Sequence, residues 1–126
     1  MTDNKIITDR EEILEAVKNR GDALKNASDT LKADREVVLE AVRNDGALKY
    51  ADESLWADRE VVLEAIRNEI GPALGPALEY ASDSLKADRE VVLEAVRRYG
   101  NALEYASDPL KADREVVLEA VRHMGY

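Results

Sequence analysis

Residues 34–42 read Asp-Arg-Glu-Val-Val-Leu-Glu-Ala-Val, and the same letters return unchanged at 88–96 and 113–121. Near-copies begin at Asp9 (DREEILEAV) and Asp58 (DREVVLEAI). The five starts are separated by 25, 24, 30 and 25 residues, so the chain of 126 residues is one internal repeat read five times. A period of this length is typical of a solenoid, in which no unit buries a core alone and stability comes from stacking.

The repeated segment predicts a long helix in each unit. Asp34 is suited to cap its start, and Glu36 in the first turn suits the positive end of the helix dipole. The apolar residues cover an arc of roughly 200° at about 100° per residue, which is wide enough to contact both neighbouring units. Equivalent core positions are expected for Leu39, Leu63, Leu93 and Leu118.

A second landmark, Ala-Leu, begins 11 residues before each following Asp start. We predict a short helix there, with Leu48, Ala51 and Leu55 on its buried face. A further cap is expected before the next long helix, with Asp108 at the N-cap and Pro109 at the first helical position. The predicted fold class is therefore all-α, a short solenoid of helix pairs with about 24–25 residues per repeat.

One helical-repeat domain is predicted over residues 1–126, with units that start at 9, 34, 58, 88 and 113. Residues 1–8 resemble the tail of a preceding unit. The irregular spacing comes from an insertion near 69–76, in which Gly-Pro-Ala-Leu occurs twice. The insertion is either a tolerated duplication in a loop or a lengthened loop on the binding face, where Ile70 and Leu74 would be contact residues.

The fifth long helix has no short helix after it, and a polar cap is not evident at either end of the repeat. One side of this helix should then be partly uncovered, at Val116, Val117, Leu118 and Val121. This predicts weak self-association through the C-terminal end, unless Met124 and Tyr126 fold back over it.

The composition limits the classes of partner. The net charge of −9 opposes binding to nucleic acid or to an anionic membrane surface, and it permits binding to a basic protein. The chain has no cysteine, so disulfides and thiolate metal sites are excluded. It shows no signal-peptide pattern and no run approaching the ~20 apolar residues that span a bilayer, which favours a cytoplasmic location.

No residue pattern predicts catalysis, a metal or a cofactor. Glu36 and Glu40 form an acidic pair that recurs unit by unit, whereas an active site is singular, so we interpret these carboxylates as a solvated face. His123 is the only histidine and has no second histidine or cysteine with which to bind zinc. The Gly-Pro tandem lacks the strand and the Lys-Ser/Thr of a phosphate loop. We therefore expect a protein that is not an enzyme.

Two groups of residues are candidate contacts for a partner. Tyr50, Tyr80 and Tyr105 share one repeat position and form either a binding platform or ordinary edge packing. Trp56 stands where other units have lysine (Lys32, Lys86, Lys111), a position expected to be solvated, so it is either a contact residue or a single exposed apolar side chain.

An arginine row is predicted to form a ladder of ion pairs rather than an anion site, because acidic residues surround it. The arginines are Arg10, Arg35, Arg59, Arg89 and Arg114. The expected partners are Asp29, Asp83 and Asp108, with Asp52 or Glu53 in that place once.

The run DREVVLEAVRNDGALKYA, with later copies of Ala-Leu-x-Tyr-Ala-Ser, resembles the helical repeats of the domain of unknown function 4116 family, over roughly Asp9 to Arg122. The resemblance implies an interaction role and assigns no functional residues, and the Gly-Pro tandem departs from it. We therefore expect a non-enzymatic scaffold that binds another protein. The alternative is an acidic inhibitor that mimics nucleic acid against a DNA-binding or nuclease target, and its binding would weaken steeply with salt.

Overall fold

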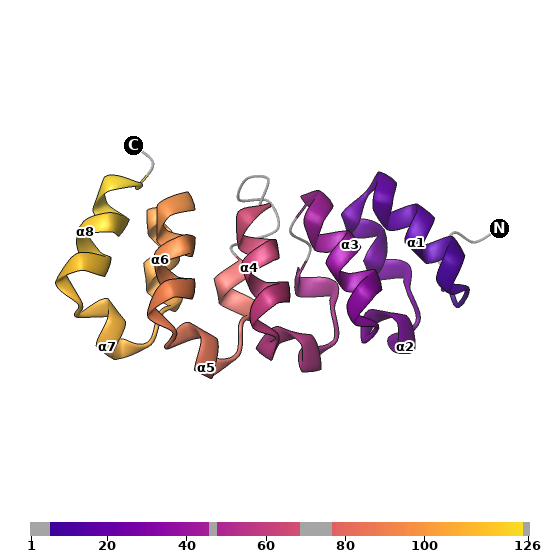
Figure 1. Ribbon diagram of the computed structural model, residues 1–126, viewed down its shortest axis with the longest axis horizontal. Coiled ribbons are helices and arrows are strands. Elements are labelled where there is room, and N and C mark those ends of the chain that lie inside the picture. The colour runs from indigo at the N-terminus through magenta and orange to yellow at the C-terminus, as the bar shows by residue number, and fades with distance from the viewer. Residues whose placement is uncertain (1–5, 46–47, 69–76, 125–126) are drawn as a thin grey trace.

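Long α-helices stand side by side in chain order in the computed structural model, which describes residues 6–45, 48–68 and 77–124 (Figure 1). Within these residues the long helices are α1 (Arg10–Asn19), α3 (Arg35–Asp45), α4 (Arg59–Arg67), α6 (Arg89–Arg98) and α8 (Arg114–Arg122). Each packs on the next, and α1 and α8 lie at opposite ends of the row. The all-α repeat solenoid predicted from the sequence is confirmed.

The aspartate that opens each repeat caps its long helix. Asp34 accepts hydrogen bonds from the backbone N–H groups of Glu36 and Val37, at 3.0 and 3.2 Å. The same position is held in the other long helices by Asp9, Asp58, Asp88 and Asp113. A capping carboxylate satisfies N–H groups that have no partner inside the helix, so the repeated Asp fixes where each helix begins.

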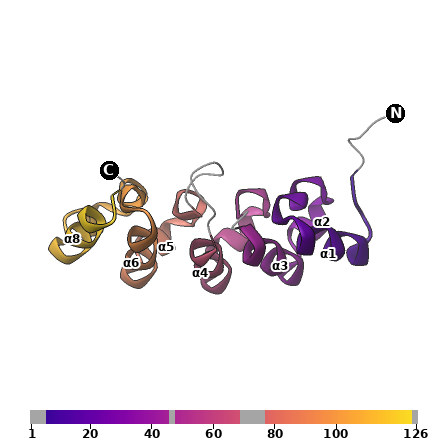
Figure 2. The ribbon, with the colours of Figure 1, turned by 90° about the horizontal axis from the view of Figure 1, so that it is seen from above.

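The predicted short helices are 3₁₀-helices, which form a second layer along one side of the row (Figure 2). They are η1 (Gly21–Asn26), η2 (Leu48–Tyr50), η5 (Ala77–Tyr80) and η6 (Gly100–Tyr105). Consecutive members contact each other, and each also touches the long helices on either side of it. Such short segments are not stable alone, so the fully buried Leu24, Leu48 and Leu78 hold them in place.

A further helical turn precedes each following long helix, as the sequence predicted. These turns are α2 (Asp29–Lys32), η3 (Glu53–Ala57), α5 (Asp83–Lys86) and α7 (Asp108–Lys111). The predicted cap of α7 was wrong by one residue, because Ser107 is the N-cap and Asp108 already lies inside the helix. Leu31, Leu55, Leu85 and Leu110 anchor the turns in the core.

A backbone hydrogen bond joins each turn to the next unit. The carbonyl of Lys32 accepts from the N–H of Asp52, and that of Trp56 accepts from Ser82, both at 2.9 Å. The carbonyl of Ile7 accepts from Ser28 in the same way, also at 2.9 Å. Residues 6–8 therefore hold the place that the end of a preceding turn holds elsewhere.

The end helix α8 reveals which side of a long helix faces which neighbour. Val116, three residues after the capping Asp, is fully buried against the preceding unit, whereas Leu118 and Val121 are 45% and 49% exposed. Their interior counterparts Leu63 and Ile66 are 8% and 0% exposed, because the following helix covers them. The predicted exposure is confirmed for Leu118 and Val121, Val117 is half-buried, and the prediction for Val116 was wrong.

Helix α1 differs from the others on its outward side. At the repeat position where α3, α4, α6 and α8 carry a buried valine, α1 carries Glu12, which is exposed. Its inward residues Ile13 and Val17 are fully buried. The N-terminal helix therefore has a polar outer face, which sequence inspection had not recognised, whereas α8 keeps the apolar face of an interior unit.

Candidate partner-binding surface

The arginine row forms a ladder between successive units, but not with the predicted partners. Arg10 donates to the capping Asp34 of the next unit at 2.7 Å and also contacts Glu36. The other rungs are Arg35 with Asp58 and Glu60, Arg59 with Asp88 and Glu90, and Arg89 with Asp113 and Glu115. The starts of consecutive long helices lie side by side, so these carboxylates are nearer to each arginine than Asp29, Asp83, Asp108 or the Asp52–Glu53 pair.

A second row of ion pairs crosses the long helices near their ends. Arg67 lies 3.3 Å from Glu94, and Arg97 lies 3.4 Å from Glu119, in each case from one unit to the next. Arg43 reaches both Glu40 and Glu64, at 3.8 and 3.9 Å. The acidic stripe of the long helices is therefore interleaved with arginine, and it is not the purely solvated face that the sequence suggested.

We expect the unfolding temperature to fall as the pH drops below about 4, because the ladder holds carboxylates in their charged form. The hydrogen bond from Arg10 lowers the pKa of Asp34, and that from Arg35 lowers the pKa of Asp58. Burial alone would raise the pKa of Asp88, but Arg59 and backbone N–H groups outweigh it and the pKa is lowered. A lowered folded-state pKa adds stability above the unfolded pKa, and this stability is lost as the pH falls through the folded value.

Thermal unfolding between pH 6 and pH 3 measures this loss. Asp34→Asn is the matched variant, because asparagine also caps a helix but carries no charge to titrate. Its unfolding temperature should fall less with acid than that of the wild type. Identical acid sensitivity of the two proteins would contradict the role given to Asp34.

The tyrosines of the repeat lie at the ends of the 3₁₀-helices. Tyr50, Tyr80 and Tyr105 are each half-buried, with part of the ring packed against the core. The Nζ atom of Lys49 lies 5.3 Å from the ring centroid of Tyr50, within the range of a cation–π contact. The structure thus places the three predicted tyrosines on one layer, with part of each surface accessible.

Trp56 is not the solvated side chain that its lysine-like position predicted. It is half-buried, and its Nε1 donates to the backbone carbonyl of Leu48 at 3.1 Å. Its ring lies 5.8 Å from that of Tyr80, at an interplanar angle of 55°. Trp56 therefore supports the tyrosine row from the turn η3, because its polar atom is satisfied and its ring is partly covered.

The residue before the tyrosine position of the repeat changes charge from one end of the 3₁₀ layer to the other. It is Lys25 and Lys49 in the first two units and Glu79 and Glu104 in the next two. Burial raises the pKa of Tyr105, and the nearby carboxylates of Glu79 and Glu104 raise it further. Sequence reasoning missed Lys49, Glu79 and Glu104 as site residues, although aligning the units by their tyrosines would have revealed the switch.

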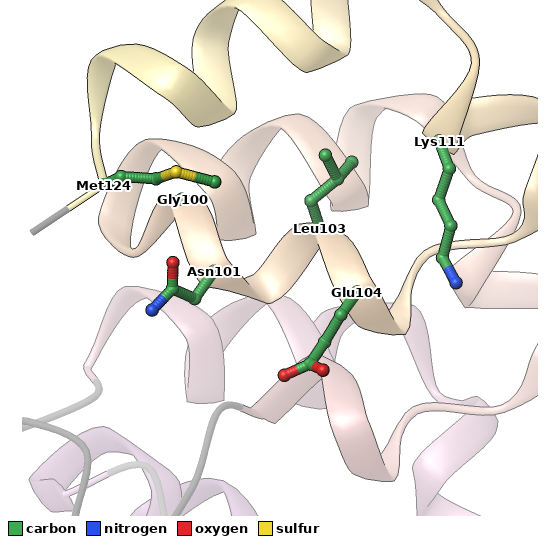
Figure 3. A pocket seen from close by; sticks show the side chains of 6 residues that line it. All are labelled: Gly100, Asn101, Leu103, Glu104, Lys111 and Met124. Carbon is green, nitrogen blue, oxygen red and sulfur yellow. The ribbon is translucent and has the colours of Figure 1, made fainter.

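An open hollow of about 530 Å³ lies at the C-terminal end of this layer (Figure 3). It is lined by Gly100, Asn101, Leu103, Glu104, Lys111 and Met124. Leu103 is half-buried here, whereas its counterpart Leu78 is fully buried under the next unit. The side chain of Met124 lies across Gly100 of η6, whereas Leu118 and Val121 on the uncovered side of α8 stay exposed, so Met124 does not cover that side.

In the described ranges, no group of three or more His, Cys, Asp or Glu side chains could hold a metal ion, and no helix is long and apolar enough to cross a membrane. The Nε2 atom of His123 lies 3.6 Å from Glu119 on its own helix. Ile70 and Leu74, together with Tyr126, lie outside the described residues.

Comparison with known proteins identifies the repeat. The profile of the family described as "Domain of unknown function (DUF4116)" matches residues 9–47, 73–111 and 88–126. No curated protein and no solved structure shows significant similarity to the chain.

Proposed function

The chain belongs to the DUF4116 family, and we propose that it acts as a non-enzymatic scaffold that binds another protein through its 3₁₀ layer. The observation that carries the proposal is the aromatic row of Tyr50, Tyr80 and Tyr105, supported by Trp56. Half-buried tyrosines held on a rigid layer offer a large contact area at a small entropic cost, and aromatic side chains are enriched at protein interfaces.

The opposite layer is less suited to this role. The ladder pairs Arg10, Arg35, Arg59 and Arg89 with carboxylates of the next unit, and a partner would have to compete with those pairs. The same pairing weighs against the alternative of nucleic-acid mimicry, which needs rows of carboxylate free of nearby cations. Glu36, Glu60, Glu90 and Glu115 each contact an arginine instead.

Self-association through α8 is a weaker candidate. The exposed Leu118 and Val121 offer an apolar surface, but in a head-to-tail contact a second copy would present Glu12 of α1 to them. Burying that carboxylate against leucine and valine is unfavourable. We therefore favour a different protein as the partner.

The proposal predicts that partners captured from the source cell by the wild-type chain are lost from a Tyr80→Ala, Tyr105→Ala variant. Truncating two central aromatic contacts commonly removes most of the affinity of an interface. Arg89→Gln is the matched control, since it changes an exposed residue of the opposite layer and should retain the partners. Circular dichroism checks that each variant is folded, and retention of every partner by a folded double-tyrosine variant would refute the assignment.

A further inference from the structure

The contact between Lys49 and Tyr50 shows what the tyrosine position of this repeat can hold. In unit two, the lysine that precedes the tyrosine places its Nζ atom 5.3 Å from the ring centroid. The ring face attracts a cation because the aromatic quadrupole is negative there. Unit two therefore fills this position with a cation of its own.

Units three and four have the same tyrosine without the lysine. Glu79 precedes Tyr80 and Glu104 precedes Tyr105, and both glutamates are exposed. Among the described residues, no cation lies over the ring of Tyr80 or Tyr105 as Lys49 lies over that of Tyr50. These two positions thus combine a partly accessible ring with a neighbouring carboxylate and lack the cation that completes the arrangement in unit two.

The two positions also form one continuous surface. The helices η5 and η6 that carry Tyr80 and Tyr105 contact each other, and the carboxylates of Glu79 and Glu104 add to the burial that raises the pKa of Tyr105. Trp56 contacts Tyr80 from the preceding unit, and the hollow beside Glu104 extends the surface toward the C-terminal end (Figure 3). Glu104 is exposed and lines the hollow, so its carboxylate is accessible to a partner (Figure 3).

We infer that Tyr80 and Tyr105 receive lysine or arginine side chains of the partner protein, with Glu79 and Glu104 as counter-charges. This deepens the proposed function, on which it rests, by specifying a partner segment that is basic where it crosses units three and four. Charge complementarity favours this occupant, because anionic segments would meet two exposed carboxylates. It also agrees with a net charge of −9 on the chain.

Short blocked peptides of alternating lysine and serine, and of alternating glutamate and serine, are suitable probes. Trp56 is the only tryptophan, so its fluorescence reports binding beside Tyr80. The lysine peptide should bind and the glutamate peptide should not. In the variant Glu79→Lys, Glu104→Lys, the chain supplies its own lysines in the arrangement of Lys49, and we expect affinity for the lysine peptide to fall at least about tenfold.

The converse variant, Lys49→Glu, should bind the lysine peptide severalfold more tightly, because it frees the ring of Tyr50. A variant of equal charge change, Glu11→Lys with Asp29→Lys, controls for long-range electrostatics and should change affinity little at physiological salt, since both sites lie in unit one. Unchanged lysine-peptide binding by the folded Glu79→Lys, Glu104→Lys variant, or preference for the glutamate peptide, overturns the inference. The proposed function fails separately, if captured partners survive loss of the tyrosines.

Discussion

Leu63→Ala is expected to lower the free energy of unfolding by about 2–5 kcal/mol, as deletion of a buried leucine does when the cavity cannot collapse. Leu63 is 8% exposed and lies in the middle of the stack, where α6 covers it. Leu118 occupies the same repeat position and is 45% exposed. Leu118→Ala should therefore cost only about 1 kcal/mol, because part of the side chain already contacts water.

Urea unfolding of the two variants provides the measurement. Their midpoints report the loss of stability when the slope of the unfolding free energy against urea concentration is unchanged. The pair is informative because the local sequence is nearly identical and only the neighbouring unit differs. Leu14→Ala, at the half-buried counterpart in α1, should fall between them. Equal losses at Leu63 and Leu118 would show that stability does not depend on stacking from both sides.

Gly100→Ala is expected to be the second most damaging change, at about 2–3 kcal/mol, because the added methyl group overfills a packed junction. A Cβ atom on Gly100 would lie 2.0 Å from the carbonyl oxygen of Ala120 and 2.8 Å from the Cγ atom of Met124. The methionine side chain can move, but the carbonyl belongs to the backbone of α8. The N–H of Gly100 also donates to the carbonyl of His123 at 3.0 Å, so displacing α8 breaks that bond.

Hydrogen exchange locates the damage as well as measuring it. In Gly100→Ala, amides of α8 should exchange faster than those of α4, because the variant loosens one junction and not the whole stack. Asn101→Ala, at the exposed neighbouring residue, is the control and should leave exchange unchanged. Unaltered protection of α8 in the glycine variant would mean that the junction tolerates a side chain.

The repeat letters predict the architecture well because a solenoid is decided by local signals. The capping Asp and the spacing of Val37, Leu39 and Val42 define a helix and its two packing faces without reference to distant residues. The 3₁₀ character of η2 was not predictable in the same way. The Ala-Leu landmark always begins 11 residues before the next Asp. Tertiary packing must fit two helical segments into this short stretch, and the 3₁₀ character of η2 follows from that constraint.

Side-chain partners were the weaker part of the prediction. Nothing local indicates that Arg35 reaches Asp58 and Glu60, because this choice depends on how closely the starts of neighbouring helices approach. Trp56 was misplaced for a related reason. A lysine at this position can extend its charged end into water, whereas an indole ring of similar reach finds a carbonyl and a tyrosine to pack against.

The polar residue on the outer side of α1 gives the array a direction of growth. A unit added beyond α8 would pack its DREV helix on the exposed Leu118 and Val121. Arg114 forms no ion pair within the described residues and would be available to the capping Asp of that unit. A unit added before α1 would meet Glu12 at the position where the other long helices carry a buried valine. The apolar side of α8 is therefore the better face for extension, so designed arrays built from this repeat should be lengthened after α8.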